Sequence, residues 1–135
     1  MSAVTRATAP TVPEKELPPE AYRQAVDQAD LAISITDPKA NILFANEAFT
    51  RVTGYATEEI VGQNQSMLSN QTTPGEIYQR MWDELAAQRA CSGRLLNRKK
   101  NGLVYLAELT ISPIVDAEGR TTHFLGMHRD VTELH

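Results

Sequence analysis

The chain has 135 residues, enough for one domain with a terminal extension, and 41% of them are hydrophobic, which permits a packed core. The formal net charge of −4 argues against a nucleic-acid partner, and the densest basic run, 98–100, falls where a hairpin turn is expected. A single cysteine, Cys91, excludes an internal disulfide, and no Cys/His cluster has zinc spacing, so we expect a cytoplasmic protein without a metal site or a membrane span.

The N-terminal part is predicted to contain a tail and one helix. Residues 1–17 lack the apolar core of a signal peptide and are expected to be a disordered tail. Residues 18–29 are expected to form a flanking amphipathic helix, because Pro and Glu suit its start and four apolar residues share one face: Tyr22, Ala25, Val26 and Ala29. This helix either packs on its own domain, residues 30–135, or pairs with a second copy of the chain.

A β-hairpin is predicted to follow this helix. Residues 31–36 alternate in polarity and are rich in β-branched side chains, which favours a strand. Residues 37–41 have the composition of a turn, and residues 42–45 form the returning strand.

Helices are predicted in the middle of the chain. Asn46 is placed to cap a short helix that ends at Gly54, and Thr57 to cap a further helical turn. Residues 73–88 carry an apolar stripe at helical spacing and should form the longest helix. The segment 64–70 has no strong period, so no element is predicted there.

Three strands are predicted to complete the domain: residues 92–98, 103–114 and 121–131. Two strands, then helices, then three antiparallel strands indicate an α+β domain and not a wound parallel sheet. The helices should cover one face of a single five-stranded sheet, with room for a ligand between the two layers.

Several short motifs, in this order and at these spacings, resemble the PAS domain family of sensory modules. They are Ser34-Ile-Thr-Asp37, Asn46-Glu-Ala-Phe49, Gly54-Tyr55, Lys100-Asn-Gly102 and Gly126-Met-His-Arg-Asp130. The resemblance runs from Ala21 to Leu134 and implies an antiparallel sheet of strand order 2-1-5-4-3 with helices on one face. PAS domains bind haem, flavin, small acids or nothing, so the fold does not by itself define the ligand.

Two segments resemble the flavin-facing parts of the light-sensing LOV subgroup: Gly62–Leu68 and Leu95–Lys99. In that subgroup an asparagine at the position of Asn97 meets the pyrimidine edge of the flavin, where an N–H lies between two carbonyls. One amide supplies both the acceptor and the donor that this edge requires. The photoreactive cysteine of the subgroup corresponds to Gln65, which excludes a covalent cysteinyl adduct at that position.

Other positions resemble the FAD-binding, redox-sensing PAS domains of the NifL family of nitrogen-fixation regulators. The second LOV asparagine corresponds to Ala107 and the LOV glutamine to His128, whereas Tyr105–Leu109 and Leu125–Asp130 match the NifL family almost residue for residue. A member of that family has an acid at the position of Gln65, so a proton transfer through this side chain would be slowed or rerouted here. The resemblance implies FAD as the cofactor, in preference to FMN.

The cofactor-binding residues implied by these resemblances come from both halves of the chain: Ser34, Asn64, Gln65, Leu68, Ile77, Arg80, Met81, Trp82, Leu95, Asn97, Arg98, Leu109 and His128. Some alternatives remain open at this point. Trp82 is either a core residue or a ring contact, His128 is either structural or near the flavin, and Arg80, Arg98 and Lys99 either meet the diphosphate or are solvated.

The sequence therefore predicts an FAD-binding redox or oxygen sensor that signals to a downstream output domain and forms a homodimer through its N-terminal helix and sheet. The alternatives are a cysteine-less blue-light receptor, a ligand-free dimerisation module and a haem oxygen sensor. Haem needs an axial ligand, and residues 73–88 contain no histidine. No nucleophile–base pair is visible, so we do not expect an enzyme.

Overall fold

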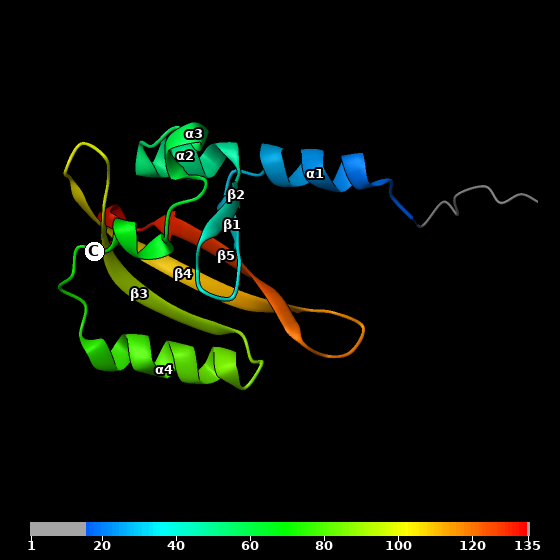
Figure 1. Ribbon diagram of the computed structural model, residues 1–135. Helices are drawn as coiled ribbons and strands as arrows, with labels where there is room; N and C mark the ends of the chain where they lie inside the picture. The colour runs from blue at the N-terminus through cyan, green and yellow to red at the C-terminus, as the bar shows by residue number, and fades with distance from the viewer. Residues whose placement is uncertain (1–15, 135) are drawn as a thin grey trace, which may run out of the picture.

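The computed structural model describes residues 16–134, so most of the predicted tail lies outside the described residues. Apart from two short 3₁₀ segments, Figure 1 shows the helices and strands in the order that the sequence predicts. They are α1 (Pro19–Gln28), β1 (Ala32–Thr36), β2 (Ile42–Ala45), α2 (Glu47–Thr53), α3 (Thr57–Ile60), the 3₁₀ helix η1 (Gln65–Leu68), α4 (Gly75–Ala86), β3 (Cys91–Arg98), β4 (Val104–Val115), β5 (Thr121–Asp130) and the 3₁₀ turn η2 (Thr132–Leu134).

The five strands form one antiparallel sheet in the order β2-β1-β5-β4-β3, which confirms the predicted α+β fold and its topology. In Figure 1, α4 runs beside β3, and α2 and α3 lie together near β1 and β2. The register pairs Ser34 with Gly126, and Gly126 with Ile111. Because successive side chains of a strand point to opposite faces, these three residues share the face that the helices cover.

The apolar interior divides into two clusters. The closed cluster is formed below α2 and α3 by Ala32, Ile42, Ala45, Phe49, Ile60 and Leu68. The cavity cluster is formed between α4 and the sheet by Met81, Leu85, Cys91, Leu95, Leu109 and Phe124. The chain thus has one sheet but two packing regions, and the second region borders the ligand site described below.

The helix ends show one confirmed cap and one wrong prediction. Asn46 caps α2, since its Oδ1 accepts a hydrogen bond of 3.0 Å from the Phe49 N–H, and Gly54 ends that helix with a φ of 81°. Thr57, by contrast, does not cap α3 but is its first residue, and Ala56 precedes it at the cap position. The Glu59 carboxylate reaches back to accept the Ala56 N–H at 2.8 Å, so the acid three residues on satisfies the helix end.

The segment 64–70, for which the sequence predicted no element, contains η1. The Asn64 Oδ1 accepts the Ser66 N–H at 3.0 Å, and the Ser69 N–H reaches back to the carbonyl of Ser66 at the same distance. A four-residue 3₁₀ helix is too short to show a hydrophobic period, which explains why the pattern gave no signal. No helix in the described part of the chain is long and apolar enough to cross a membrane.

Candidate functional site

A cavity of about 250 Å³ lies between the sheet and the layer formed by α4 and η1. Residues far apart in the sequence meet here, because side chains of β1, β3, β4 and β5 line the cavity together with side chains of η1 and α4. Nine of the predicted cofactor-binding residues line this cavity: Ser34, Asn64, Gln65, Met81, Trp82, Leu95, Asn97, Leu109 and His128.

The other four predicted residues do not line the cavity. Leu68 is 1% exposed and belongs to the closed cluster, and Ile77 packs against the outside of the cavity cluster. Arg80 is exposed on α4. Arg98 is also exposed, and its guanidinium donates a hydrogen bond of 2.8 Å to the Asn70 side chain. Cofactor contacts of these four residues remain predictions.

The cavity has lining residues that the sequence did not single out: Thr36, Lys39, Ala40, Ser66, Ser69, Tyr78, Leu85, Ile111, Phe124 and Gly126. Strand alternation could have found some of them, because Thr36 shares a face with Ser34, and Phe124 and Gly126 share one with His128. Lys39 and Ala40 sit in a turn, and only the folded chain brings that turn to the cavity.

Hydrogen bonds tie this β1–β2 turn to η1 and so build one rim of the cavity. The Asn64 Nδ2 donates to the Lys39 carbonyl at 2.9 Å and to the Asn41 Oδ1 at 3.0 Å. The Gln65 N–H donates to the Ala40 carbonyl at 2.8 Å. The backbone of Gln65 is therefore fixed, and its side chain is placed at the cavity.

Apart from Lys39 at the rim, the polar side chains that line the cavity are neutral. The Gln65 Oε1 is the only buried side-chain oxygen or nitrogen without a hydrogen-bond partner in the described chain. Ser34 is 2% exposed and Asn97 is 9% exposed, and both line the same space. Lys39 is the only lysine or arginine among the described lining residues, and none of them carries a carboxylate. An unpartnered buried amide oxygen is costly, so this site favours a ligand that donates a hydrogen bond.

His128 and Tyr105 form a buried neutral pair at one end of the site. The Tyr105 hydroxyl and the His128 Nε2 are 3.1 Å apart. Burial lowers the pKa of His128 to about 4, although Asp130 opposes this shift, and burial raises the pKa of Tyr105 to about 12. Both rings are uncharged near neutral pH because the site excludes water from their charged forms.

Lys99 and Cys91 are engaged elsewhere. The Lys99 ammonium is 3.3 Å from the Asp130 carboxylate and 5.4 Å from the centre of the Tyr105 ring, so it is held at the sheet. Cys91 packs in the cavity cluster but is not among the residues that line the cavity, and burial raises the pKa of its thiol. A thiol with a raised pKa is a poor nucleophile.

The comparisons with known proteins agree with this architecture. The family model described as the PAS fold matches residues 20–131, and the chain belongs to the PAS family. A nitrogen fixation regulatory protein of Klebsiella oxytoca is 40% identical over 114 residues, which cover 84% of this chain and 23% of that protein. This similarity confirms the predicted resemblance to nitrogen-fixation regulators.

Two solved structures are similar in fold and in sequence. An RNA-binding Light-Oxygen-Voltage receptor has a TM-score of 0.83 and 30% identity, over 93% of this chain and 37% of that one. A Light-Oxygen-Voltage domain whose mechanism was examined with a flavin analogue has a TM-score of 0.75 and 28% identity, over 84% of this chain and 86% of that one. Together with the regulator, they support a PAS sensor domain of a signalling protein. The chain spans less than a quarter of the regulator's length.

Proposed function

We propose that this chain is an FAD-binding sensor module that reports the redox state of its flavin to a downstream output domain. The observation that carries this proposal is the unpartnered Gln65 Oε1 at an apolar cavity that also presents the Asn97 amide and the Ser34 hydroxyl. The flavin analogue named for one structural neighbour and the similarity to a nitrogen fixation regulator support a flavin as the ligand.

The residues present fit a flavin. Its pyrimidine edge carries an N–H between two carbonyls, and the Asn97 amide offers a matching acceptor and donor. Apolar side chains, among them Leu95 and Leu109, supply walls for a planar ring. The Gln65 amide has a donor and an acceptor group, and the Ser34 hydroxyl can both donate and accept, so they can serve the central edge of the ring in either of its protonation states.

The redox signal would pass through hydrogen bonds. A bound flavin supplies electron transfer, and its N5 accepts a hydrogen bond when oxidised and donates one when reduced. The Gln65 amide and the Ser34 hydroxyl would rotate, so that they donate to the oxidised ring and accept from the reduced one. His128, with its pKa of about 4, carries no proton to give near neutral pH, and none of the described lining residues has a carboxylate. The response of this chain would thus be a reorientation of neutral groups.

FAD is proposed over FMN because of the similarity to the nitrogen fixation regulator. The rest of the dinucleotide would leave the cavity past its rim. Lys39 lies at that rim, and the exposed side chains of Arg80 and Arg98 are further candidates for the diphosphate.

The first experiment is an absorption spectrum of the purified protein, followed by heat release and mass identification of the cofactor. A flavin spectrum with FAD released supports the proposal. Protein that stays colourless after incubation with FAD refutes it and leaves a ligand-free module, and a Soret band would indicate haem.

The second experiment compares Asn97→Ala with Ser92→Ala, an exposed position of the same strand. Loss of the amide should raise the Kd for FAD by about tenfold or more, since one or two hydrogen bonds in a buried site are lost. The Ser92 variant should bind like the parent. Equal affinities in both variants would contradict the placement of the ring edge at Asn97.

A blue-light receptor is the second candidate, favoured by the likeness to the two Light-Oxygen-Voltage structures. Gln65 stands where the resemblance places the photoreactive cysteine, and Cys91 does not line the cavity. Light would then act by photoreduction and not by adduct formation. Illumination without an added electron donor separates the two functions, because a light receptor would have to take the electron from its own chain, for which the cavity-lining Trp82 is the candidate, and change its spectrum, whereas a redox sensor should not.

The proposal includes an output domain beyond this chain and a homodimer that uses α1 and the sheet. Sedimentation equilibrium of the chain with and without residues 1–29 tests the dimer. The truncated form should have a lower ratio of average mass to its own monomer mass at the same concentration, and a ratio of one in both forms would rule the dimer out.

A further inference from the structure

Helix α1 is largely exposed and needs a fixed point on the domain. It has ten residues, none of which is buried, and Figure 1 shows it extending from the domain beside α2. A helix of this length is marginal in water without tertiary contacts. Its position must therefore depend on contacts at its C-terminal end, where the chain enters β1.

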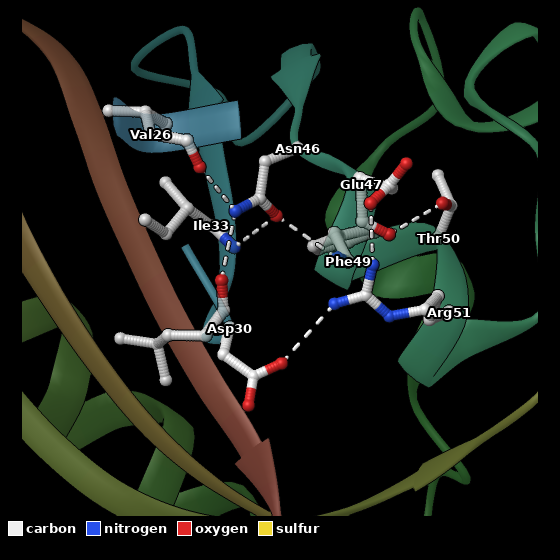
Figure 2. A network of polar contacts seen from close by, with 9 residues as sticks. Val26, Asp30, Ile33, Asn46, Glu47, Phe49, Thr50 and Arg51 are labelled. Atoms are coloured by element: carbon white, nitrogen blue, oxygen red, sulfur yellow. Dashed lines mark hydrogen bonds and ion pairs between the residues drawn. The ribbon is translucent and has the colours of Figure 1, made fainter. Parts of the chain in front are cut away.

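The Asn46 side chain makes the buried contact at this end. Figure 2 shows its amide between the last turn of α1, the start of β1 and the start of α2. The Nδ2 donates to the carbonyls of Val26 at 2.8 Å and Leu31 at 2.9 Å. The Oδ1 accepts from the N–H groups of Ile33 at 2.9 Å and Phe49 at 3.0 Å. Every hydrogen-bonding position of this fully buried amide is used.

The second polar link in this region is exposed. The Arg51 guanidinium is 3.3 Å from the Asp30 carboxylate, which is fully exposed, and 2.7 Å from Glu47 within the same helix. Exposed ion pairs contribute little to stability. The Asn46 amide is therefore the stronger polar connection between α1 and the domain.

The acceptor side of the same amide leads toward the cavity. Phe49, whose N–H it binds, places its ring edge-on to His128 with 5.3 Å between ring centres, and His128 lines the cavity. Ile33, the other donor, precedes the cavity-lining Ser34 in β1. A shift of His128 or Ser34, which line the cavity, would therefore move the N–H of Phe49 or Ile33, and the Asn46 oxygen accepts a hydrogen bond from each.

We propose that Asn46 is a positioning residue that links the cavity wall to α1, so that a change at His128 or Ser34 alters how firmly α1 is held. The amide works as one rigid plane. Movement of the two donors on its oxygen side is transferred to the two carbonyls on its nitrogen side, one of which belongs to the last turn of α1. The coupling to flavin redox state rests on the proposed function, whereas the attachment of α1 does not.

Two substitutions separate the halves of the amide. Asn46→Asp keeps an oxygen for the Phe49 N–H and replaces the Nδ2 donor by an oxygen that faces the Val26 and Leu31 carbonyls. Asn46→Ser keeps a good helix cap without adding a buried charge, and its side chain is too short to bridge both sides. Arg51→Gln is the matched control, because it removes the exposed link to Asp30, together with an exposed ion pair within α2, and leaves the Asn46 amide in place.

Amide hydrogen exchange of the chain, read separately over α1 and α2, tests the attachment. In both Asn46 variants the α1 amides should exchange roughly tenfold faster, the loss expected for one hydrogen bond to the partly buried Val26 carbonyl, while α2 amides keep their protection. The Arg51 variant should resemble the parent. Unchanged α1 exchange in both Asn46 variants overturns the proposal, and so does an equal loss in α1 and α2, which would make Asn46 a structural cap alone.

The coupling is tested by the same measurement on the FAD-loaded protein in air and after reduction with dithionite. The parent should change its α1 exchange upon reduction, and Asn46→Ser should not. A parent that binds FAD but shows no change refutes the link to the cavity. A protein that binds no FAD refutes the proposed function. The link between the cavity wall and α1 is then tested with Phe49→Leu, which should speed the exchange of the α1 amides if Phe49 helps to position the Asn46 side chain. Unchanged α1 exchange in this variant refutes the link.

Discussion

The closed cluster and the cavity cluster are both apolar, but their side chains are buried to different extents. Members of the closed cluster are 0–4% exposed, and three of its large side chains, Phe49, Ile42 and Ile60, are completely buried. Members of the cavity cluster are 4–9% exposed and surround a cavity of about 250 Å³. The half of the domain that contains the closed cluster is therefore fully packed, whereas in the other half side chains border an open cavity.

The difference follows from how each helix is held. Helix α2 is fixed by the Asn46 cap, and the Thr53 hydroxyl donates to the Phe49 carbonyl at 2.9 Å. Helix α4 begins after Pro74 without a side-chain cap, and its Trp82 is 44% exposed. We therefore expect the more stable packing under α2 and α3, whereas the part of the same sheet face under α4 can admit a ligand.

The strongest test of this comparison exchanges one phenylalanine in each half for alanine. Phe49→Ala should lower the free energy of unfolding by about 3–5 kcal/mol, because a fully packed ring is removed. Phe124→Ala should cost clearly less, since its ring already borders open space. Chemical denaturation of both variants checks this, and equal losses would show that the two halves are equally packed.

His128 contacts both halves, and its titration should be the next largest effect. Its pKa of about 4 in the folded state lies below the ordinary value of 6.5, so the unfolded chain binds the proton first. Stability is then full above pH 6.5 and falls as the pH drops toward 4, by on the order of 3 kcal/mol in total. Denaturation of the parent and of His128→Gln at several pH values isolates this contribution. Parallel pH profiles would show that His128 is not buried as neutral imidazole.

Gly126→Ala adds a methyl group at the cavity wall and should change the free energy of unfolding by a smaller amount. The added Cβ would lie 3.1 Å from the Ser34 Oγ, which is tighter than most such contacts in proteins, so the hydroxyl would have to move. We expect a loss of about 1 kcal/mol that disappears when Ser34→Ala is present as well, since the alanine makes room for the methyl group. A double-mutant cycle measured by thermal unfolding gives the coupling. Strictly additive effects would place the two side chains apart.

The smallest effect is expected on the uncovered face of the sheet. The Glu108 carboxylate lies 3.2 Å from Arg94 and 2.8 Å from Arg129, and these two guanidinium groups lower its pKa. Exposed ion pairs are weak and are screened by salt. Glu108→Gln should shift the unfolding midpoint less than any variant above, and high salt should remove the shift. A larger, salt-independent shift would mean that this face is covered.

Much of the fold was predictable because its local signals agree. The hairpin of β1 and β2, the Asn46 cap and the apolar stripe of α4 each have the period or turn chemistry that their structure requires. Strand order was not contained in those patterns and came from the resemblance to PAS domains. Thr57 was misjudged because a threonine before acidic residues is a common cap, whereas here Glu59 satisfies the helix end from inside.

The site was predictable in part. Residues such as Asn97 and Ser34 were found because family motifs include them, and their cavity positions follow from strand alternation. Lys39 and Ser69 were missed, since they reach the cavity only through contacts between turns. Glu108 precedes the cavity-lining Leu109 in β4, and the alternation of the strand places its carboxylate on the opposite face, with two arginines.

Trp82 is the only tryptophan in the sequence, and its ring lies at the cavity, edge-on to Phe124 with 5.8 Å between ring centres. The fluorescence of an indole responds to its surroundings and is quenched by a nearby chromophore that absorbs its emission. The fold consequently provides its own optical reporter. Filling or emptying of the cavity can be followed in the unlabelled protein through one side chain.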